Sequence, residues 1–217
     1  MSFIQTVAPE QASGEVLAMY QRQQAHFGYL PNYARAFSHR PDVMASWATL
    51  LATIRRHVDP RRFELVTLAA AQALGNSYCA LAHGRALEGL LGTDDTRAIV
   101  AGDERSTLTE AERAMMEFAR LVARDASRVC QGDVDRLLAL GFADEEIFDI
   151  VTVAAARAFF TKVLDGLGTE ADAVFREMAP ELREALTVGR AIAAAESDRR
   201  LRNSHEATRL TTRGMIR

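Results

Sequence analysis

A disulfide framework and a long apolar run are both missing from this 217-residue chain. Its two cysteines, Cys79 and Cys130, cannot make a disulfide scaffold, and a reducing compartment would keep any bridge between them transient. Arg, Asp or Glu interrupts the apolar stretches every few residues, and the start MSFIQTVAPEQ has neither a basic n-region nor an apolar h-region. We therefore expect a cytoplasmic protein without a membrane partner.

A strong excess of one charge is also absent. The chain has 26 Lys and Arg residues against 29 Asp and Glu residues, a formal net charge of −3, which argues against a nucleic-acid partner. It contains no GxGxxG or P-loop motif, so no nucleotide is expected. The histidines His26, His39 and His57 show no ligand spacing with a second histidine or a carboxylate. We predict neither a metal site nor a cofactor.

Helix is the secondary structure that the composition favours. Prolines number only five, alanines are frequent, and no alternating polar and apolar run competes. Caps and first-turn prolines predict helix starts, and glycines predict helix ends. The predicted starts lie at or near Ser13, Pro31, Pro41, Asp59, Thr107 or Thr109, Asp133, Asp144 and Thr169, and the predicted ends at Gly28, Gly75, Gly92, Gly102, Gly141 and Gly166 or Gly168. The pattern indicates about eight to ten helices in an all-α bundle.

Two segments of the chain resemble each other. Residues 63–73 read FELVTLAAAQA and residues 148–158 read FDIVTVAAARA, so seven of eleven positions are identical. Asp59 and Asp144 precede them at the same offset of 85, and both are expected to cap a helix. We predict a duplicated helical unit. Chance agreement between two Ala- and Val-rich helices is the alternative.

The offset also shows where the two units differ. It pairs Glu64, Asn76, Cys79 and His83 of the first unit with Asp149, Thr161, Leu164 and Gly168 of the second. The second unit has lost both the thiol and the imidazole. Any chemistry is therefore expected in the first unit, and the second is expected to be scaffold.

A cysteine, a histidine and a glutamate form the candidate site of the first unit. Asn76 and Ser77 are good caps, which places Cys79 in the first turn of a helix, where free N–H groups and the helix dipole lower a thiol pKa. His83 lies four residues further on the same helix face and can take the thiol proton. Glu64, on the preceding antiparallel helix, is expected to meet His83 rather than Cys79. The predicted relay runs from Glu64 through His83 to Cys79.

Each of these residues also has a purely structural interpretation. A cysteine in an Ala- and Leu-rich helix is most often a small buried hydrophobe, a histidine is often a hydrogen-bonded core residue or a surface residue, and a glutamate in a first turn favours the helix by itself. Tyr78 either donates a hydrogen bond to a bound oxygen or packs. Helical spacing relates Met44, Trp47, Leu50, Leu51 and Ile54, which we interpret as packing in the core or at a subunit interface.

The spacing of the site resembles that of a known superfamily. Eleven residues separate Glu64 from Asn76, and His83 follows Cys79 by four. This resembles the carboxymuconolactone decarboxylase and AhpD-like alkyl hydroperoxidase superfamily, whose pattern is a glutamate, eleven residues, C-x-x-C and a histidine four after the second cysteine. The segment GYLPNYARAFSHRP at 28–41 resembles its peroxidase-related branch. The likeness covers nearly all of residues 3–190 and implies an AhpD-like helical bundle.

The resemblance implies four catalytic residues. Cys79 matches the second cysteine of the pattern, His83 its relay histidine and Glu64 its relay acid. Tyr78 matches the position between the two cysteines, where a histidine or a tyrosine occurs.

This sequence departs from the pattern at Asn76, which replaces the first cysteine. A two-cysteine peroxide cycle needs a partner thiol to condense with the sulfenic acid, and that partner is missing. An external thiol would have to resolve Cys79, or Cys130 would have to approach it. We interpret Cys130 mainly as structural, because nothing in the sequence brings it within disulfide distance.

The implied activity is that of a thiol-dependent alkyl hydroperoxide reductase, a peroxidase-related antioxidant enzyme with a single relay-linked cysteine. Its partners would be a small hydroperoxide, an external thiol reductant and further copies of the chain in a homo-oligomer. Two alternatives stay open. One is a lactone or carboxylate enzyme like the decarboxylase branch, and the other is a non-catalytic oligomeric module for redox sensing or binding.

The chain divides into one helical domain and a tail. The AhpD-like domain is expected over residues 1–196, with its active unit at about 40–92 and a degenerate repeat at about 108–178. Residues 197–217 carry six arginines against Asp198 and Glu206, a net charge of +4. This basic tail is expected to be extended, docked on a neighbouring subunit or disordered.

Overall fold

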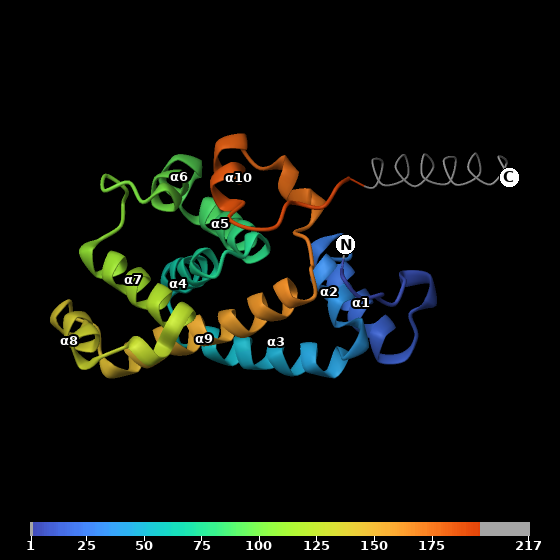
Figure 1. The fold of residues 1–217 in the computed structure, drawn as a ribbon, viewed down its shortest axis with the longest axis horizontal. Coiled ribbons are helices and arrows are strands. Elements are labelled where there is room, and N and C mark those ends of the chain that lie inside the picture. The colour runs from blue at the N-terminus through green and yellow to red at the C-terminus, as the bar shows by residue number, and fades with distance from the viewer. Residues whose placement is uncertain (1, 196–217) are drawn as a thin grey trace, which may run out of the picture.

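The computed structural model describes residues 2–195, and this part of the chain is the all-α bundle that the sequence predicts (Figure 1). Its ten α-helices are α1 (Gly14–Phe27), α2 (Asn32–Ala36), α3 (Pro41–Arg55), α4 (Pro60–Ala73), α5 (Ser77–Leu91), α6 (Thr93–Ala101), α7 (Glu110–Asp125), α8 (Gln131–Ala139), α9 (Asp144–Gly166) and α10 (Pro180–Leu186). Within residues 2–195 there is no strand, only an isolated bridge between Ala171 and Ile192. The predicted basic tail at 197–217 lies outside the described residues.

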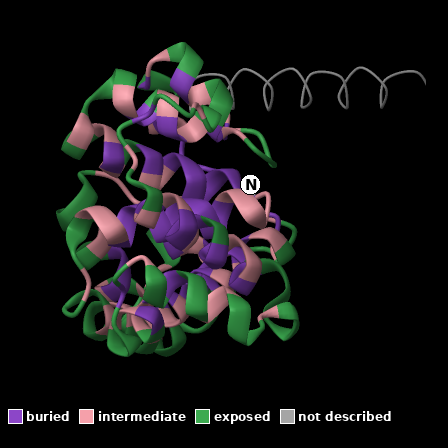
Figure 2. Cartoon of the chain, turned by 90° about the vertical axis from the view of Figure 1, so that its left-hand side faces the viewer, coloured by how far each residue is buried: buried purple, intermediate pink, exposed green. Residues whose placement is uncertain are grey.

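Helix α4 lies at the centre of the molecule. It packs against α5, α7 and α9, and Figure 1 shows it between α5 on one side and α3 and α9 on the other. Leu65, Leu68 and residues 69–71 on α4 are completely buried. Figure 2 shows the same arrangement as a buried interior wrapped by exposed outer turns. None of the helices in the described residues is both long and apolar enough to cross a bilayer.

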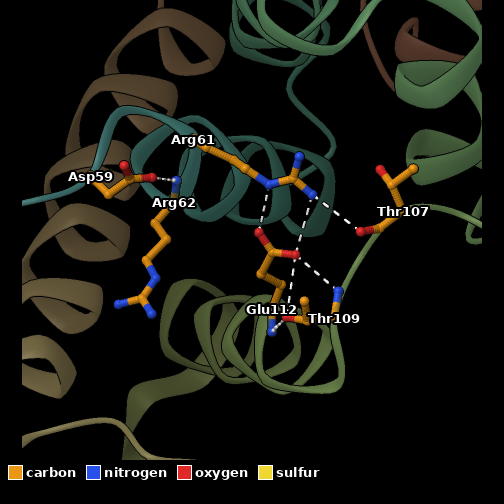
Figure 3. Close-up of polar contacts among 6 residues, drawn as sticks. All are labelled: Asp59, Arg61, Arg62, Thr107, Thr109 and Glu112. Atoms are coloured by element: carbon orange, nitrogen blue, oxygen red, sulfur yellow. Dashed lines mark hydrogen bonds and ion pairs between the residues drawn. The ribbon is translucent and has the colours of Figure 1, made fainter.

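Caps fix where α4 and α7 begin (Figure 3). The Asp59 carboxylate accepts the Arg62 backbone N–H at 3.1 Å, as predicted for a helix cap. Thr109 and Glu112 form a reciprocal capping box at the start of α7. Such a cap stabilises a helix by about 1 kcal/mol. The Arg61 guanidinium also binds Glu112, with an Nε–Oε1 distance of 2.6 Å, so the starts of two neighbouring helices are tied together.

The two similar segments, 63–73 and 148–158, are both helical, but the chain continues differently after them. After the first, the chain turns at Gly75, whose φ of +68° is in the left-handed region, and α5 starts as a separate helix. After the second, Phe160 stands at the position that corresponds to Gly75, and α9 continues unbroken over 23 residues. The cap predicted at Asp144 is wrong, because α9 already includes Asp144 and its first turn is closed by Glu146, which accepts the Ala143 N–H at 2.9 Å.

The segment after α9 also departs from the sequence prediction. The helix predicted to start at Thr169 is absent, because residues 169–172 are occupied in other contacts: Asp172 accepts the Asn32 backbone N–H at 2.7 Å, and Ala171 bridges to Ile192. A short 3-10 helix follows at Ala173–Glu177, then α10. Helix α10 packs so closely on α5 that a Cβ added to Gly84 would lie 2.4 Å from Leu186.

Candidate active site

The start of α5 holds the candidate nucleophile. Asn76 is the N-cap residue, and its Oδ1 accepts the Cys79 backbone N–H at 2.8 Å. Cys79 therefore lies in the first turn, as predicted. Its exposed fraction is only 1%, because α5 enters the core instead of starting at the surface.

The predicted contact between the glutamate and the histidine is present. His83 Nδ1 lies 2.5 Å from Glu64 Oε2, so the antiparallel pairing of α4 and α5 brings the carboxylate to the imidazole rather than to the thiol. Arg55, at the end of α3, lies 3.5 Å from the other Glu64 oxygen. Since an ionised carboxylate can only accept, His83 donates through Nδ1 and its Nε2 atom keeps a lone pair.

His83 is neutral near pH 7. Burial is the main cause that lowers its pKa, and the positive charge of Arg157 lowers it further, while the contact with Glu64 acts in the opposite direction. A neutral imidazole whose tautomer is fixed by a carboxylate is a proton acceptor. It lies one helical turn from Cys79 on the same helix.

Arg157, on α9, reaches the thiol, although the sequence pattern did not indicate it as a site residue. Its guanidinium Nη1 lies 3.4 Å from Cys79 Sγ, and the residue is 3% exposed. Among the described residues, Arg157 provides the side-chain hydrogen bond to Sγ, and His83 provides none. The available signal was an arginine in the Ala-rich segment 148–158, where the first segment has Gln72. The second segment thus contributes to the site and is more than scaffold.

The expectation of a lowered thiol pKa is wrong for this structure. Burial raises the pKa of Cys79, while the charge and hydrogen bond of Arg157 act to lower it and Asp165 adds a smaller raising effect. The helix N-terminus alone does not decide the protonation of a sulfur that solvent does not reach. At neutral pH the resting group is a thiol, and its proton has to be accepted by another group.

Tyr78 belongs to a different polar cluster. Its hydroxyl donates to the buried carboxylate of Asp172, which also accepts from the Tyr29 hydroxyl at 3.1 Å and from the Asn32 N–H. The Tyr33 N–H donates to the Tyr78 oxygen at 3.4 Å. Burial, followed by the charge of Asp172, raises the pKa of Tyr78 well above its usual value. This cluster joins α2, α5 and the segment after α9, and the structure does not bring the Tyr78 hydroxyl into contact with Cys79, His83 or Glu64.

Cys130, the second cysteine, has different surroundings from Cys79. Cys130 is exposed and precedes α8, where its N–H donates to Asp133 at 2.9 Å, whereas Cys79 is buried; both are free thiols. The side chain of Asn76, at the position of the missing cysteine, is engaged in capping α5. No second thiol is therefore poised beside Cys79 within residues 2–195.

A cavity of about 280 Å³ lies between α4, α7 and α9. Its lining combines apolar side chains, among them Val66, Met115 and Val153, with charged ones, among them Arg62 and Glu146. Val153 precedes Arg157 by four residues, so both project from one face of α9, about one helical turn apart. The cavity and the thiol site therefore share a helix face.

Known proteins share both a segment and the fold with this chain. Residues 41–100, which include Glu64, Cys79 and His83, match the profile of the Carboxymuconolactone decarboxylase family. No functionally curated protein matches the chain by sequence.

Several solved structures have the same fold. An uncharacterized peroxidase-related protein from Ralstonia eutropha JMP134, described as an alkylhydroperoxidase AhpD core, has a TM-score of 0.71 and 20% identity, covering 87% of this chain and 98% of that one. An uncharacterized peroxidase-related protein from Silicibacter sp. TM1040 has a TM-score of 0.68 and 19% identity, covering 80% and 95%. The debrominase Bmp8, solved as a cysteine-to-alanine variant with 2,3,4-tribromopyrrole, has a TM-score of 0.68 and 17% identity, covering 84% and 97%. At these identities the likeness shows the fold.

Proposed function

For a chain that carries a carboxymuconolactone decarboxylase family segment within the AhpD-like helical fold, we propose the activity of a thiol-dependent alkyl hydroperoxide reductase with Cys79 as its nucleophile. One observation carries this proposal. A buried thiol accepts a hydrogen bond from a guanidinium, and one turn further along the same helix an imidazole with a lowered pKa is held by a carboxylate. This arrangement provides a proton acceptor for the thiol and a cation for the thiolate.

The reaction begins with transfer of the Cys79 proton to His83 Nε2. The Glu64 carboxylate stabilises the resulting imidazolium through Nδ1, at the 2.5 Å contact. The thiolate then attacks the distal oxygen of the hydroperoxide and the O–O bond breaks, which leaves a sulfenic acid on Cys79 and an alkoxide. His83 returns the proton to the alkoxide, and an alcohol leaves. The sulfur is oxidised by two electrons and the hydroperoxide is reduced by two.

An external thiol completes the cycle in this proposal. Asn76 caps α5 where a C-x-x-C motif would place a thiol, and Cys130 is exposed while Cys79 is buried. One molecule of external thiol condenses with the sulfenic acid, which releases water and forms a mixed disulfide. A second thiol attacks this disulfide, regenerates the Cys79 thiol and leaves as the oxidised reductant.

The cavity between α4, α7 and α9 supports an organic hydroperoxide as substrate. Val66, Met115 and Val153 in its lining suit an alkyl group, and Arg157, which contacts the Cys79 sulfur, follows Val153 by one turn of α9. None of Cys79, His83 and Arg157 lines this cavity, so in this proposal the substrate extends along α9 from Val153 to Arg157, which brings its peroxide oxygens to Cys79.

Consumption of an organic hydroperoxide with dithiothreitol as reductant tests this function. We expect turnover in the wild type and in Cys130→Ser, and none in Cys79→Ser, because serine cannot form a sulfenic acid. Mass spectrometry after one equivalent of hydroperoxide should find one added oxygen on Cys79. Equal rates in the wild type and in Cys79→Ser would refute the proposal.

Lactone or carboxylate chemistry is the second candidate, and a specific observation favours it. The Glu64–His83 pair is well formed, whereas burial raises the pKa of Cys79. An acid–base enzyme would use the pair and leave the thiol idle. Activity toward a lactone substrate that survives in Cys79→Ser but is lost in His83→Ala would establish this function instead.

We also propose that the chain is a homo-oligomer. Helix α3 has no charged side chain between Val43 and Ile54, although much of it is exposed, and Leu50 is 54% exposed. On α9, which packs beside α3, Phe148 and Phe159 are 67% and 44% exposed. An uncharged helix face next to exposed phenylalanines is typical of a surface covered by another subunit.

A further inference from the structure

Arg157 is a buried cation that the fold does not use for pairing. The residue is 3% exposed, and within residues 2–195 no carboxylate lies at ion-pair distance from its guanidinium. Buried arginines are normally paired with carboxylates, because an isolated charge loses its hydration. Here the hydrogen bond that the guanidinium donates goes to the Cys79 sulfur.

Arg157 is surrounded by aromatic rings and by buried N–H groups that have no hydrogen-bond acceptor. The guanidinium carbon lies 5.8 Å from the ring centroid of Trp47 and 5.6 Å from that of Phe160. Arg157 Nε and Trp47 Nε1 are both buried without a hydrogen-bond partner. Such atoms cost stability unless an entering group satisfies them. The cation–π contacts with Trp47 and Phe160 stabilise the guanidinium in part, but its Nε has no acceptor and no carboxylate neutralises it, so its partners within the described residues are incomplete.

Building on the proposed function, we propose that Arg157 is a catalytic residue that holds the negative charge of the Cys79 thiolate and donates from its unpaired Nε to an oxygen of the hydroperoxide. The cation stands where the sulfur becomes charged when its proton moves to His83. After attack, the charge passes to the leaving alkoxide oxygen, and the same guanidinium can bind that oxygen until His83 returns the proton. No further oxidant or reductant is needed for this step.

The other charged groups around the sulfur do not replace Arg157. On α5, the pKa of His83 is lowered by burial, and Glu64 on α4 is a carboxyl group that brings no positive charge. Arg55, at the end of α3, is largely exposed and lies against Glu64. From α9, the negative charge of Asp165 acts against thiolate formation. Arg157 is therefore the cation in direct contact with Sγ among the described residues.

The test measures the ionisation of Cys79 without turnover. In a Cys130→Ser background, where Cys79 is the single thiol, ultraviolet thiolate absorbance is followed against pH for Arg157 and for Arg157→Met, Arg157→Gln and Arg157→Lys. We expect the Cys79 pKa to rise by at least one unit in the methionine and glutamine variants, which reduces the thiolate fraction about tenfold near neutral pH. The lysine variant should lie between them and the parent. Arg120→Met, which removes a half-buried arginine on α7, is the matched control and should not move the pKa.

Thermal unfolding separates this role from a structural one. Since methionine removes an unpaired buried charge and fills similar space, we expect Arg157→Met to unfold at the same or a higher temperature. A lower unfolding temperature together with an unchanged Cys79 pKa would show a structural role and overturn the proposal. If the methionine variant does not fold, the pKa in Arg157→Gln decides. Peroxide turnover is measured separately, so a shifted pKa in a protein that consumes no hydroperoxide would refute the proposed function and leave the role of Arg157 at the thiolate standing.

Discussion

Replacing Asn76 by cysteine should give the protein a resolving thiol. Asn76 is the N-cap of α5 and Cys79 lies three residues on, which places the two side chains about one helical turn apart. A disulfide requires Cα atoms within about 7 Å, and residues three apart at the start of a helix meet this limit. After peroxide oxidises Cys79, the introduced thiol should condense with the sulfenic acid, release water and close an internal disulfide.

The cost in stability follows from the hydrogen bond that is lost. Asn76 Oδ1 accepts the Cys79 N–H at 2.8 Å, and both residues are buried. Loss of an N-cap side chain costs about 1 kcal/mol, which lowers the unfolding temperature by about 2–4 °C in a domain of this size. Asn76→Ser is the matched control, because its hydroxyl can cap the helix but cannot form a disulfide.

Intact-mass analysis and reductant dependence together provide the assay. Asn76→Cys treated with one equivalent of hydroperoxide should lose two hydrogens overall, and peptide mapping should locate the bridge between positions 76 and 79. Asn76→Ser should instead keep one added oxygen on Cys79. If Asn76→Cys also accumulates the sulfenic acid without closing a bridge, the inferred position of the missing thiol is wrong.

Three further predictions follow from the site and the surface. Burial, and then Arg157, lower the pKa of His83 in the folded protein, so between the lowered pKa and about pH 6.5 the unfolded chain binds a proton that the folded protein does not. The free energy of unfolding should therefore be highest above about pH 6.5 and fall as the pH drops toward the lowered pKa. Urea titrations against pH should show a smaller loss of stability in His83→Gln. An equal loss in both proteins would contradict this. Val153→Phe, which narrows the 280 Å³ cavity, should reduce kcat/KM for a bulky alkyl hydroperoxide more than for hydrogen peroxide. The control Val134→Phe on α8, outside the cavity lining, should leave both kcat/KM values unchanged. An equal loss of kcat/KM for both peroxides in Val153→Phe would place the alkyl group elsewhere. Leu50→Glu should lower the mass measured by light scattering, because a charge on the exposed face of α3 opposes subunit packing, while Leu138→Glu on α8 should not; an unchanged mass would exclude this face as the interface.

The parts of the structure that the sequence predicted are local. Asp59 and Thr109 cap α4 and α7 because a cap needs only its own next three residues. The contact between Glu64 and His83 was also predictable, because a short turn at Gly75 forces two helices to run antiparallel and fixes their register.

The parts that the sequence did not predict depend on distant segments. The burial of Cys79 reverses the expected direction of its pKa shift, and this burial is tertiary: α4 packs along α5, and the Arg157 side chain of α9 reaches the sulfur. Arg157 reaches the sulfur across 78 residues of sequence, and neither spacing nor composition encodes such a contact. The absence of a helix at Thr169 has a similar cause, since the chain there is held by contacts with α2 and with Ile192.

The turn at Gly75 creates a helix N-terminus inside the protein, whereas the corresponding position in α9 lies within a continuous helix. Where a helix starts inside a core, its first N–H groups have no carbonyl partners and water does not reach them. Only a capping side chain or a bound anionic or lone-pair group can accept their hydrogen bonds. Asn76 accepts the hydrogen bond of the Cys79 N–H. The helix dipole keeps the buried beginning of α5 electropositive. Closing this break, by making position 75 as helix-compatible as Phe160, would merge α4 and α5 into one continuous helix and would remove the helix N-terminus beside Cys79.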